Sequence, residues 1–526
     1  STTQVAALSA TDMGEFSTTQ VRAFSQTQIS RLTTEAFSAL DAAQAAALTV
    51  TQLRGLTATQ VANLTSDDVN EFTTTQIAAL TTTHTRALTE TNVAALTETQ
   101  VGALTAAHMQ AFSATALSAF TDTQVAAMTT TQVSSLTAAQ VAGLDSTDVA
   151  EFTTAQLAAM STTQVRSLTA TAMADLADTQ IAALTATQIQ ALSTTALTNL
   201  ADTQLAALTT TQMAALTTGQ VRVLNETNIG ALVETQVAAL SGAQVQQLSA
   251  TALSALADTQ VSALTTTQVA ALKSNQLSAL DATDMTEFTA TQVAALSTTQ
   301  LRGLSVTNVG ALADTQVAAL TATQLQGLSS SQLATFDATQ IGALTTTQIA
   351  ALSAAQVKGL TATSIGALAD TQIAAMTATQ IGALTATSLT ALDETQIGAM
   401  TATQVGALVR TQLAALAATT LSALDADQAA ALTVTQLRAL TNTQLAALSA
   451  EDMAEFNETQ LAGFTAAQVG ALTATAMENL ADTQIAAFTS TQVKAFSGTV
   501  LSSLADTQLS ALTTTQIDAL STSQMA

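Results

Sequence analysis

Several residue types are missing from this chain of 526 residues, and each absence excludes something. The chain contains no Pro, Cys, Trp or Tyr, and only 9% of its residues are charged, against about a quarter in ordinary globular domains. Without Cys there are no disulfides and no thiolate metal ligands. Because acids and bases are sparse and there are two His in all, the side-chain diversity of an enzyme active site is absent. We therefore predict that the chain is not an enzyme and has no cofactor.

The remaining composition also restricts partners and targeting. Net charge is -25, which disfavours nucleic acid and anionic membrane surfaces as partners. No apolar run approaches a membrane span, since Thr, Ser or Gln recurs every few residues. The chain begins and ends in mid-pattern with no signal-peptide pattern. We expect residues 1–526 to be one continuous solenoid, cut from a longer array.

What fills the chain is a repeat of eight residues. Leu8, Phe16, Phe24 and Leu32 set the period, which continues to Leu520 without insertion or deletion. The consensus of this octad, numbered as positions 1 to 8, is Thr-x-Thr-Gln-Val-Ala-Ala-Leu. Positions 5 and 8 are apolar almost throughout and never charged, so they form the predicted core. Thr, Gln and scattered acids are predicted to be exposed.

The spacing of the apolar positions favours helix over strand. Residues three apart share a helix face, whereas a strand would place them on opposite faces. One continuous helix is excluded, because eight residues leave the apolar stripe rotated by about 80° per octad. The break is expected at position 1, where 55 of 66 octads carry Ser, Thr, Asp or Asn, the preferred N-cap residues. Position 4 is usually Gln, which completes a capping box. We predict an all-α superhelical solenoid with one very short helix per octad.

A second periodicity predicts the size of each superhelical turn. Basic residues at position 6 recur at gaps of 4, 7 or 10 octads. These gaps are near multiples of about 3.4, so we predict about 3.4 octads, or about 27 residues, per turn, with like residues stacked along one face. Duplication of blocks during growth of the gene is the alternative. The basic residues concerned are Arg22, Arg54, Arg86, Arg166, Arg222, Arg302, Lys358, Arg438 and Lys494.

Seven octads begin with Ala-Asp instead of a capping residue. In each case the preceding octad lacks Gln at position 4. Since Ala is a good helix former, one hypothesis is that the helix runs through these junctions. The octads begin at Ala177, Ala201, Ala257, Ala313, Ala369, Ala481 and Ala505.

Five octads carry Asp at position 4 and Glu at position 7, which places two carboxylates on one helix face. Carboxylate oxygens are ligands for calcium. The alternative is Asp near a helix N-terminus with Glu paired to an arginine, because Arg86 and Arg166 lie fifteen residues after Glu71 and Glu151. The calcium candidates are Asp12, Glu15, Asp148, Glu151, Asp284 and Glu287, and the same pattern includes Asp68 with Glu71 and Asp452 with Glu455.

Two further features have structural interpretations. His84 and His108 stand at position 4, where they are predicted to replace Gln as capping residues, not to bind metal. The Thr-x-Thr pattern is similar to the threonine arrays of ice-binding proteins. Capping uses the position 1 hydroxyl, however, and such an array needs a flat threonine face.

The octad resembles a known type of array. The strings LTTTQVAAL (264–272) and TATQIGAL (377–384) are similar to Leu-Thr-x-x-Gln-Val-x-x-Leu octapeptide repeats. These occur in very large bacterial surface or secreted proteins, often with adhesin-like or haem-utilisation labels. The resemblance covers the whole chain and implies an extracellular or cell-surface location, although no haem ligand pattern is present.

Two functions are therefore expected from the sequence. The first is structural, a rigid extracellular rod, fibre or sheath element, because the chain combines length with little chemistry. It predicts self-association or stacking onto further repeats, with neither nucleic acid nor a membrane span. The alternative is a surface binding module, an adhesin stalk that binds calcium, glycan or ice.

Overall fold

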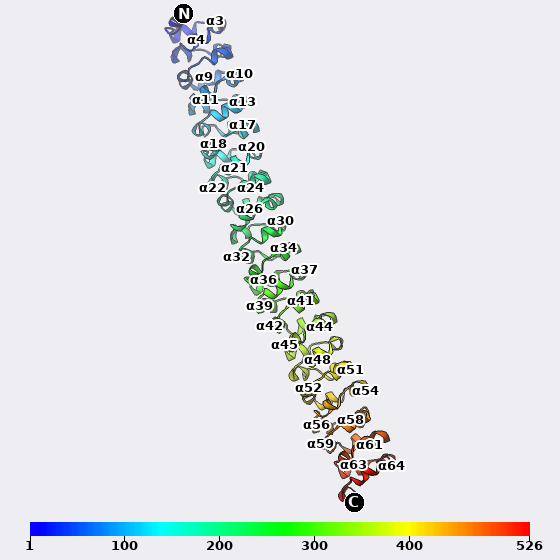
Figure 1. Ribbon diagram of the computed structural model, residues 1–526. Coiled ribbons are helices and arrows are strands. Elements are labelled where there is room, and N and C mark those ends of the chain that lie inside the picture. The colour runs from blue at the N-terminus through cyan, green and yellow to red at the C-terminus, as the bar shows by residue number, and fades with distance from the viewer. Residues whose placement is uncertain (526) are drawn as a thin grey trace. The chain divides into compact units, whose positions relative to one another are not determined.

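The structure is a computed structural model, and it describes residues 1–525. Each of the 66 octads forms one α-helix of four to six residues that begins at position 2, and no strand occurs within these described residues. Typical members are α8 (Ala58–Ala62), α12 (Glu90–Ala95) and α15 (Ala114–Leu117). Figure 1 shows these short helices succeeding one another from residue 1 onward. The predicted all-α solenoid with one helix per octad is confirmed.

Both ends of each helix follow from the octad. In α13 (Glu98–Ala103), Thr97 is the N-cap, and its backbone is extended, with φ -71 and ψ 156. The Gln100 backbone N–H donates to Thr97 Oγ1 at 3.3 Å, and Thr97 N–H donates to Gln100 Oε1 at 2.8 Å. The helix ends at Leu104, whose backbone is again extended. Helices this short are unstable alone, so stacking must hold them.

The junctions that begin with Ala-Asp differ from the hypothesis, because no helix runs through them. Ala177 has an extended backbone, with φ -67 and ψ 152, and α23 (Asp178–Ala183) begins after it. Ala177 N–H still donates to Gln180 Oε1 at 2.7 Å, so the glutamine half of the capping box remains. A break is also needed at each octad to keep positions 5 and 8 on the core. All seven junctions are extended: Ala177, Ala201, Ala257, Ala313, Ala369, Ala481 and Ala505.

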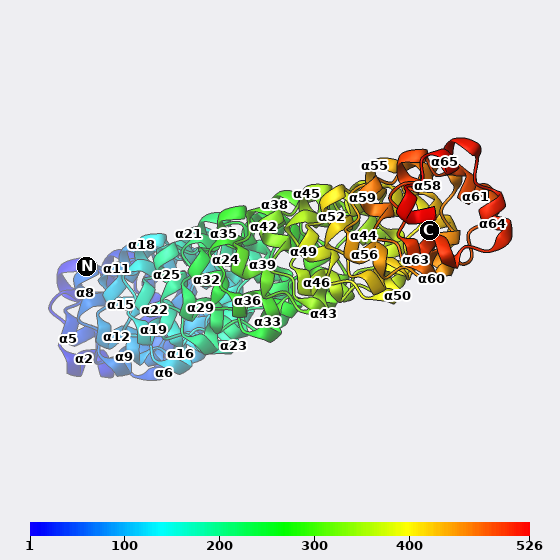
Figure 2. The same cartoon turned by 90° about the horizontal axis from the view of Figure 1, so that it is seen from below.

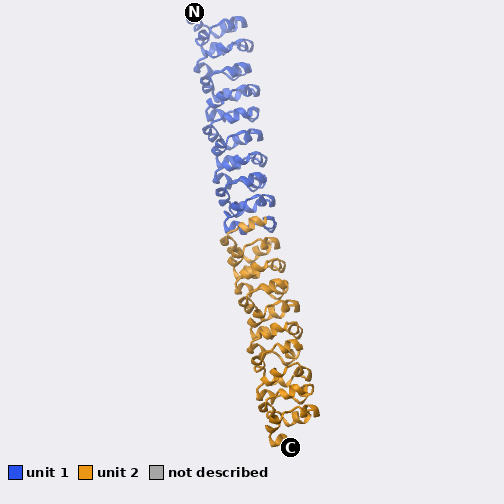
Figure 3. Cartoon of the chain, turned by 45° about the vertical axis from the view of Figure 1, so that its right-hand side comes forward, with its two compact units in different colours: residues 1–264 blue, residues 265–526 orange. Residues whose placement is uncertain are grey.

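The chain forms two compact units, Ser1–Leu264 and Thr265–Ala526 (Figure 3). Within each unit, a helix packs against the helix three octads further along. Examples are α9 (Ser66–Glu71) with α12, labelled in Figure 2, and α44 (Thr346–Ala351) with α47 (Asp370–Ala375). Glutamine side chains add hydrogen bonds to the octad that lies four octads earlier in the chain, such as the bond from Gln188 to Leu157. A turn therefore contains between three and four octads, in agreement with the predicted 3.4.

Positions 5 and 8 are the buried columns that the sequence predicts. Val101 at position 5 has no exposed surface, and Leu104 at position 8 is 4% exposed. Consecutive position 8 side chains meet inside the turn, since the Phe112 and Phe120 rings contact edge to face with centroids 5.6 Å apart. Such edge-to-face pairs add to the stability that area burial gives.

Position 4 forms a third buried column, which corrects the expectation that Gln is exposed. Gln188 and Gln236 are each only 1% exposed, as buried as the valines of position 5. A buried amide must be hydrogen-bonded at both its oxygen and its nitrogen. The glutamines satisfy this requirement between successive turns.

Small residues at positions 6 and 7 allow the turns to approach closely. A Cβ added to Gly366 at position 6 would lie 2.8 Å from the Ala391 carbonyl oxygen, three octads further along. A Cβ on Gly463 at position 7 would lie 2.6 Å from a methyl of Val434, three octads earlier. Side chains at these positions are therefore limited by backbone or side-chain atoms of the neighbouring turn.

Candidate functional site

The position 4 glutamine joins each turn to the one before it. Gln188 Oε1 accepts the Thr185 N–H at 2.6 Å, and Gln188 Nε2 donates to the Leu157 and Met160 carbonyls, both at 2.8 Å. Those carbonyls belong to positions 5 and 8 of the octad of α20 (Thr154–Ala159), at a helix C-terminus, where carbonyls lack the usual partner four residues further on. The Leu157 carbonyl also accepts the Met160 N–H at 3.2 Å. One side chain therefore serves the start of its own helix and the end of another. We call this arrangement the glutamine seam.

The seam recurs through both units. The same pair of donations, to residues 28 and 31 positions earlier, is made by Gln52, Gln132, Gln356, Gln444 and Gln492 among others. Sequence reasoning predicted the glutamine oxygen as a capping group but missed the donation by its nitrogen. A signal was present, because Glu also completes a capping box yet never stands at position 4 of this chain. A carboxylate has no N–H to donate.

Where Asp replaces the glutamine, the hydrogen bond between turns runs in the opposite direction, from a serine hydroxyl of the earlier turn to the aspartate. Asp148 Oδ2 accepts the Asp145 N–H at 2.9 Å and the hydroxyl of Ser118 at 2.6 Å. Asp68 Oδ2 likewise accepts the hydroxyl of Ser38 at 2.6 Å. Each serine lies at position 6, four octads before its aspartate. The sequence repeats this spacing of thirty residues, placing Ser254 before Asp284 and Ser422 before Asp452.

The other candidate aspartates also act in capping. Asp12 Oδ2 accepts both the N–H and the hydroxyl of Ser9 at 2.8 Å, and the backbone hydrogen bond is the main cause that lowers the pKa of Asp12. Asp284 is buried and accepts the Asp281 N–H at 2.8 Å. Its companion Glu287 is half-buried, whereas Glu15 is exposed.

Glu151 is the most perturbed carboxyl among the described residues. Its Oε2 atom is buried and has no hydrogen-bond partner. Burial, followed by hydrogen bonding and repulsion from Asp122, raises the pKa of Glu151 to about 7. It lines a small, mostly apolar cavity of about 10 Å³ with Leu117 and Phe152. Burial also raises the pKa values of Glu71 and Glu455, with Asp68 and Asp452 as their nearest repelling charges.

The expected arginine pairs are not formed. The charges that act on Glu71 and Glu151 are aspartates, and neither Arg86 nor Arg166 bonds to these glutamates. The reason is geometric, because fifteen residues is about two octads, whereas contacts between turns join octads three or four apart. Carboxylates in these octads therefore face one another.

The carboxylates are also not gathered for metal binding. Within residues 1–525, no group of three or more His, Cys, Asp or Glu side chains is placed to hold a metal ion. In the octad of α19 (Ser146–Ala150), Asp148 faces a backbone N–H and a serine hydroxyl, while Glu151 turns to Asp122. The calcium prediction thus gains no coordination shell from this part of the chain.

The two histidines take the place of seam glutamines. His84 Nδ1 accepts the Thr81 N–H at 3.3 Å, and His84 Nε2 lies 2.9 Å from the Leu56 carbonyl oxygen. His108 makes the same pair of contacts with Thr105 and Leu80. Burial lowers the pKa of His84, although its bond to Leu56 opposes this effect. The capping interpretation therefore accounts for both rings.

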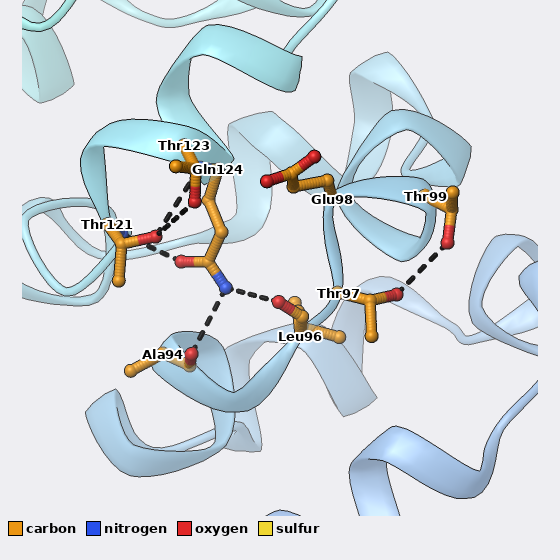
Figure 4. A pocket seen from close by; sticks show the side chains of 8 residues that line it. All are labelled: Ala94, Leu96, Thr97, Glu98, Thr99, Thr121, Thr123 and Gln124. Carbon is orange, nitrogen blue, oxygen red and sulfur yellow. Dashed lines mark hydrogen bonds between the residues drawn. The ribbon is translucent and has the colours of Figure 1, made fainter.

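The surface carries polar grooves between successive turns. One groove of about 470 Å³ is lined by Thr97, Glu98 and Thr99 on one turn and by Thr121 and Thr123 on the next (Figure 4). Hydroxyls at positions 1 and 3 pair within each turn, at 3.1 Å for the first and 3.2 Å for the second. Gln124 of the seam closes the base of the groove by donating to Ala94 and Leu96 carbonyls.

The same groove recurs farther along the first unit. It has a volume of about 360 Å³, and its lining includes Asn225, Glu226, Thr227, Ser249 and Thr251 at the equivalent positions. The glutamate at position 2 is retained and hydroxyls still line both sides, but Asn225 replaces the threonine of position 1 and Arg222 joins the lining. Both grooves thus present hydroxyls and one carboxylate, from a glutamate at position 2, but no aromatic ring.

Comparison with known proteins agrees with a repeat architecture. No helix of the described residues is long and apolar enough to cross a membrane. No curated protein matches the chain. The model of the ALTTAQ repeat matches residues 317–354, where residues 343–348 read Ala-Leu-Thr-Thr-Thr-Gln across one octad junction. Over that segment the chain is similar to the ALTTAQ repeat, and it is a repeat protein.

Proposed function

We propose that the chain is a non-catalytic structural element of the cell exterior, acting as a rigid rod, fibre or sheath component. The glutamine seam is the observation that carries this proposal. Within each unit, successive turns are tied together by buried hydrogen bonds, such as those of Gln188 to Leu157 and Met160, as well as by the apolar columns. An array tied in this way resists bending and local opening more than apolar contacts alone would.

The use of polar groups further supports a structural role. The position 1 hydroxyl, the position 4 amide and both histidines are occupied in holding the repeat together, which leaves them unavailable for acid–base chemistry. Exposed groups are hydroxyls and scattered charges. The similarity to octapeptide arrays of large bacterial surface proteins favours the cell exterior over the cytoplasm, and we extend the adhesin-like description to this chain only as a stalk.

The test is to shorten the repeat. Deletion of fourteen whole octads, residues 97–208, keeps every seam spacing and should leave helix content per residue by circular dichroism unchanged while shortening the particle by about a fifth in electron micrographs. The matched control deletes residues 97–100 alone, which shifts the apolar columns by half an octad and should disrupt local stacking. A spacer is refuted if the whole-octad deletion unfolds the chain or leaves particle length unchanged. Immunolabelling of intact cells tests the location, and labelling only after lysis would refute an exterior role.

The recurring groove favours a second candidate, a stalk that binds glycans. Hydroxyl pairs and the carboxylate of Glu98 or Glu226 can hydrogen-bond sugar hydroxyls, whereas the calcium alternative has no coordination shell in residues 1–525. Glycan binding should disappear in the variant Glu98→Gln combined with Glu226→Gln if these carboxylates take part. If that variant still bound every glycan that the parent chain binds on a glycan microarray, the groove would be refuted as the binding site.

A further inference from the structure

Acidic residues are confined to a subset of octads that recurs with the superhelical turn. The 37 acids lie in 26 octads, most of which follow the previous one at a step of three or four octads, although seven pairs of acidic octads are adjacent. A clear run in the second unit is Asp314, Asp337, Asp370, Asp393 and Asp425, separated by three, four, three and four octads. Gene duplication alone does not require this alternation, whereas stacking on one face does.

The structure places these acidic octads directly upon one another. Helices α40 (Asp314–Ala318) and α43 (Ala338–Gly342) pack together, as do α47 and α50 (Glu394–Gly398). The steps of four octads are joined by the seam, since Gln372 donates to the Gly342 carbonyl at 3.2 Å and Gln428 to the Gly398 carbonyl at 3.0 Å. The acids therefore form one stripe along each unit, which we call the acidic face.

Three basic residues of the second unit lie half a turn away from this face. No octad that contains an acid contains Lys or Arg. Arg302, Lys358 and Arg410 occupy octads 38, 45 and 52, seven octads or about two turns apart. Lys358 and Arg410 are each midway between two acidic octads of the run above, and Arg302 is midway between the octads of Asp284 and Asp314. With about 3.5 octads per turn, this midway place is on the opposite side, which we call the basic face. In the first unit, Arg54 and Arg222 each stand next to one acidic octad and two octads from another.

The cations of the basic face are exposed, and in the described residues their side-chain hydrogen bonds go to carbonyl and amide oxygens, not to carboxylates. All 12 Lys and Arg residues are exposed. Arg54 and Arg438 donate to the Ala79 and Gly463 carbonyls, at 3.3 and 2.8 Å, and Arg222 donates to Gln247 Oε1 at 3.0 Å. These contacts leave most guanidinium N–H groups directed to solvent.

We propose that copies of this chain associate side by side, with the acidic face of one copy against the basic face of the next. The argument is charge complementarity in register, because the faces repeat every seven octads and identical contacts can recur along a unit. The two faces lie on opposite sides, so the contact is heterologous and does not close into a dimer. It generates an open sheet one molecule thick. This inference deepens the proposed structural function and rests on it.

The test measures self-association of the purified chain against salt and charge. At low salt of about 0.1 M, where charges act across about 10 Å, repulsion between the net charges of two copies is screened more than contacts between the faces, so sedimentation should show large assemblies. At about 1 M, where charges act across about 3 Å, these assemblies should dissolve. The variant Arg302→Gln, Lys358→Gln, Arg410→Gln should weaken association by about tenfold or more. The matched variant Arg302→Lys, Lys358→Arg, Arg410→Lys keeps the charge and should associate as the parent does.

Several outcomes would overturn lateral pairing. A chain that remains monomeric at low salt, or assemblies that the three Gln substitutions leave unchanged, would do so. Assemblies that appear only with a divalent cation would identify bridging between acidic faces instead. End-to-end strings in micrographs, insensitive to salt, would identify stacking of chain ends. None of these results affects the outcome of the octad-deletion test, so the structural proposal and the sheet can each be refuted without the other.

Discussion

The glutamine seam can be tested at Gln188, where its cost can be worked from the contacts. The substitution Gln188→Ala removes donation to two buried carbonyls, Leu157 and Met160, and acceptance from the Thr185 N–H. A net hydrogen bond contributes about 0.5–1.5 kcal/mol, and each buried group left without a partner costs about 1–3 kcal/mol. Because the chain tolerates Ala at this position elsewhere, as at Ala172, we expect a local loss of about 2–4 kcal/mol and not global unfolding.

The substitution Gln188→Glu separates the two halves of the side chain. A glutamate keeps the capping acceptor but places a buried carboxylate beside two carbonyl oxygens, so its folded-state pKa should be raised. Stability is then retained at low pH, where the protonated carboxyl donates to one carbonyl, and is lost as pH rises through the folded pKa. Gln188→Glu should therefore be close to the parent at about pH 4 and much weaker at about pH 8.

Hydrogen exchange followed by mass spectrometry is the suitable assay, because repeat proteins open locally. A loss of about 2–4 kcal/mol corresponds to exchange about 30 to 700 times faster in α20 and α24 (Ala186–Ala191). Gln190 is the matched control, since it lies in the same octad but is exposed, and its Ala and Glu variants should exchange like the parent. Equal effects at Gln188 and Gln190, or no pH dependence of Gln188→Glu, would refute the seam.

Three more predictions address the acidic octads. Burial and Asp122 raise the pKa of Glu151 to about 7, so the stability that its protonated form gives is complete below about pH 4.5 and is lost as pH rises to about 7. The substitution Glu151→Gln should therefore raise the melting temperature at pH 8 and leave it unchanged at pH 4. A lower melting temperature of this variant at pH 8 would contradict burial as the cause of the raised pKa. Ser118→Ala removes the donor to Asp148 Oδ2 and should destabilise by about 1–2 kcal/mol in urea unfolding, whereas adding Asp148→Gln should restore stability; equal stability of Ser118→Ala and the parent would exclude the donor role. Chelation of calcium should leave the melting temperature unchanged, and a large decrease would restore the calcium hypothesis.

Local chemistry in the sequence was sufficient to predict the repeat unit. The capping Thr97, the buried Val101 and the extended Leu104 all follow from rules that act within eight residues. The size of the turn could be predicted as well, because Arg302 and Lys358 stand seven octads apart. Because the chain has no insertion or deletion between octads, spacings within an octad predict the helix and its caps, and spacings between octads predict the size of the turn.

Features that join different turns were predicted less well. The donation by Gln188 Nε2 depends on which octad supplies the carbonyl, and this is four octads away in the chain. The hydroxyl of Ser118 donates to Asp148, thirty residues further along the chain. The sequence can suggest this pair only after it is known that octads three or four apart are neighbours. Because neighbouring turns join octads three or four apart, Glu151 cannot reach Arg166, which is only two octads away. The same stacking requires an extended residue between successive helices, so Ala177 is extended despite its helix propensity.

The alternation of three and four octads between neighbours has a consequence for the gene. Insertion or loss of one whole octad by replication slippage preserves the seam, so the protein still folds, but every later residue is rotated by about 100° around the superhelix. The acidic and basic faces beyond that point then go out of alignment. Only changes of about seven octads restore both the seam and the faces. Selection on fold alone would allow any whole-octad length, whereas selection on the faces would leave surviving alleles that differ by blocks of seven.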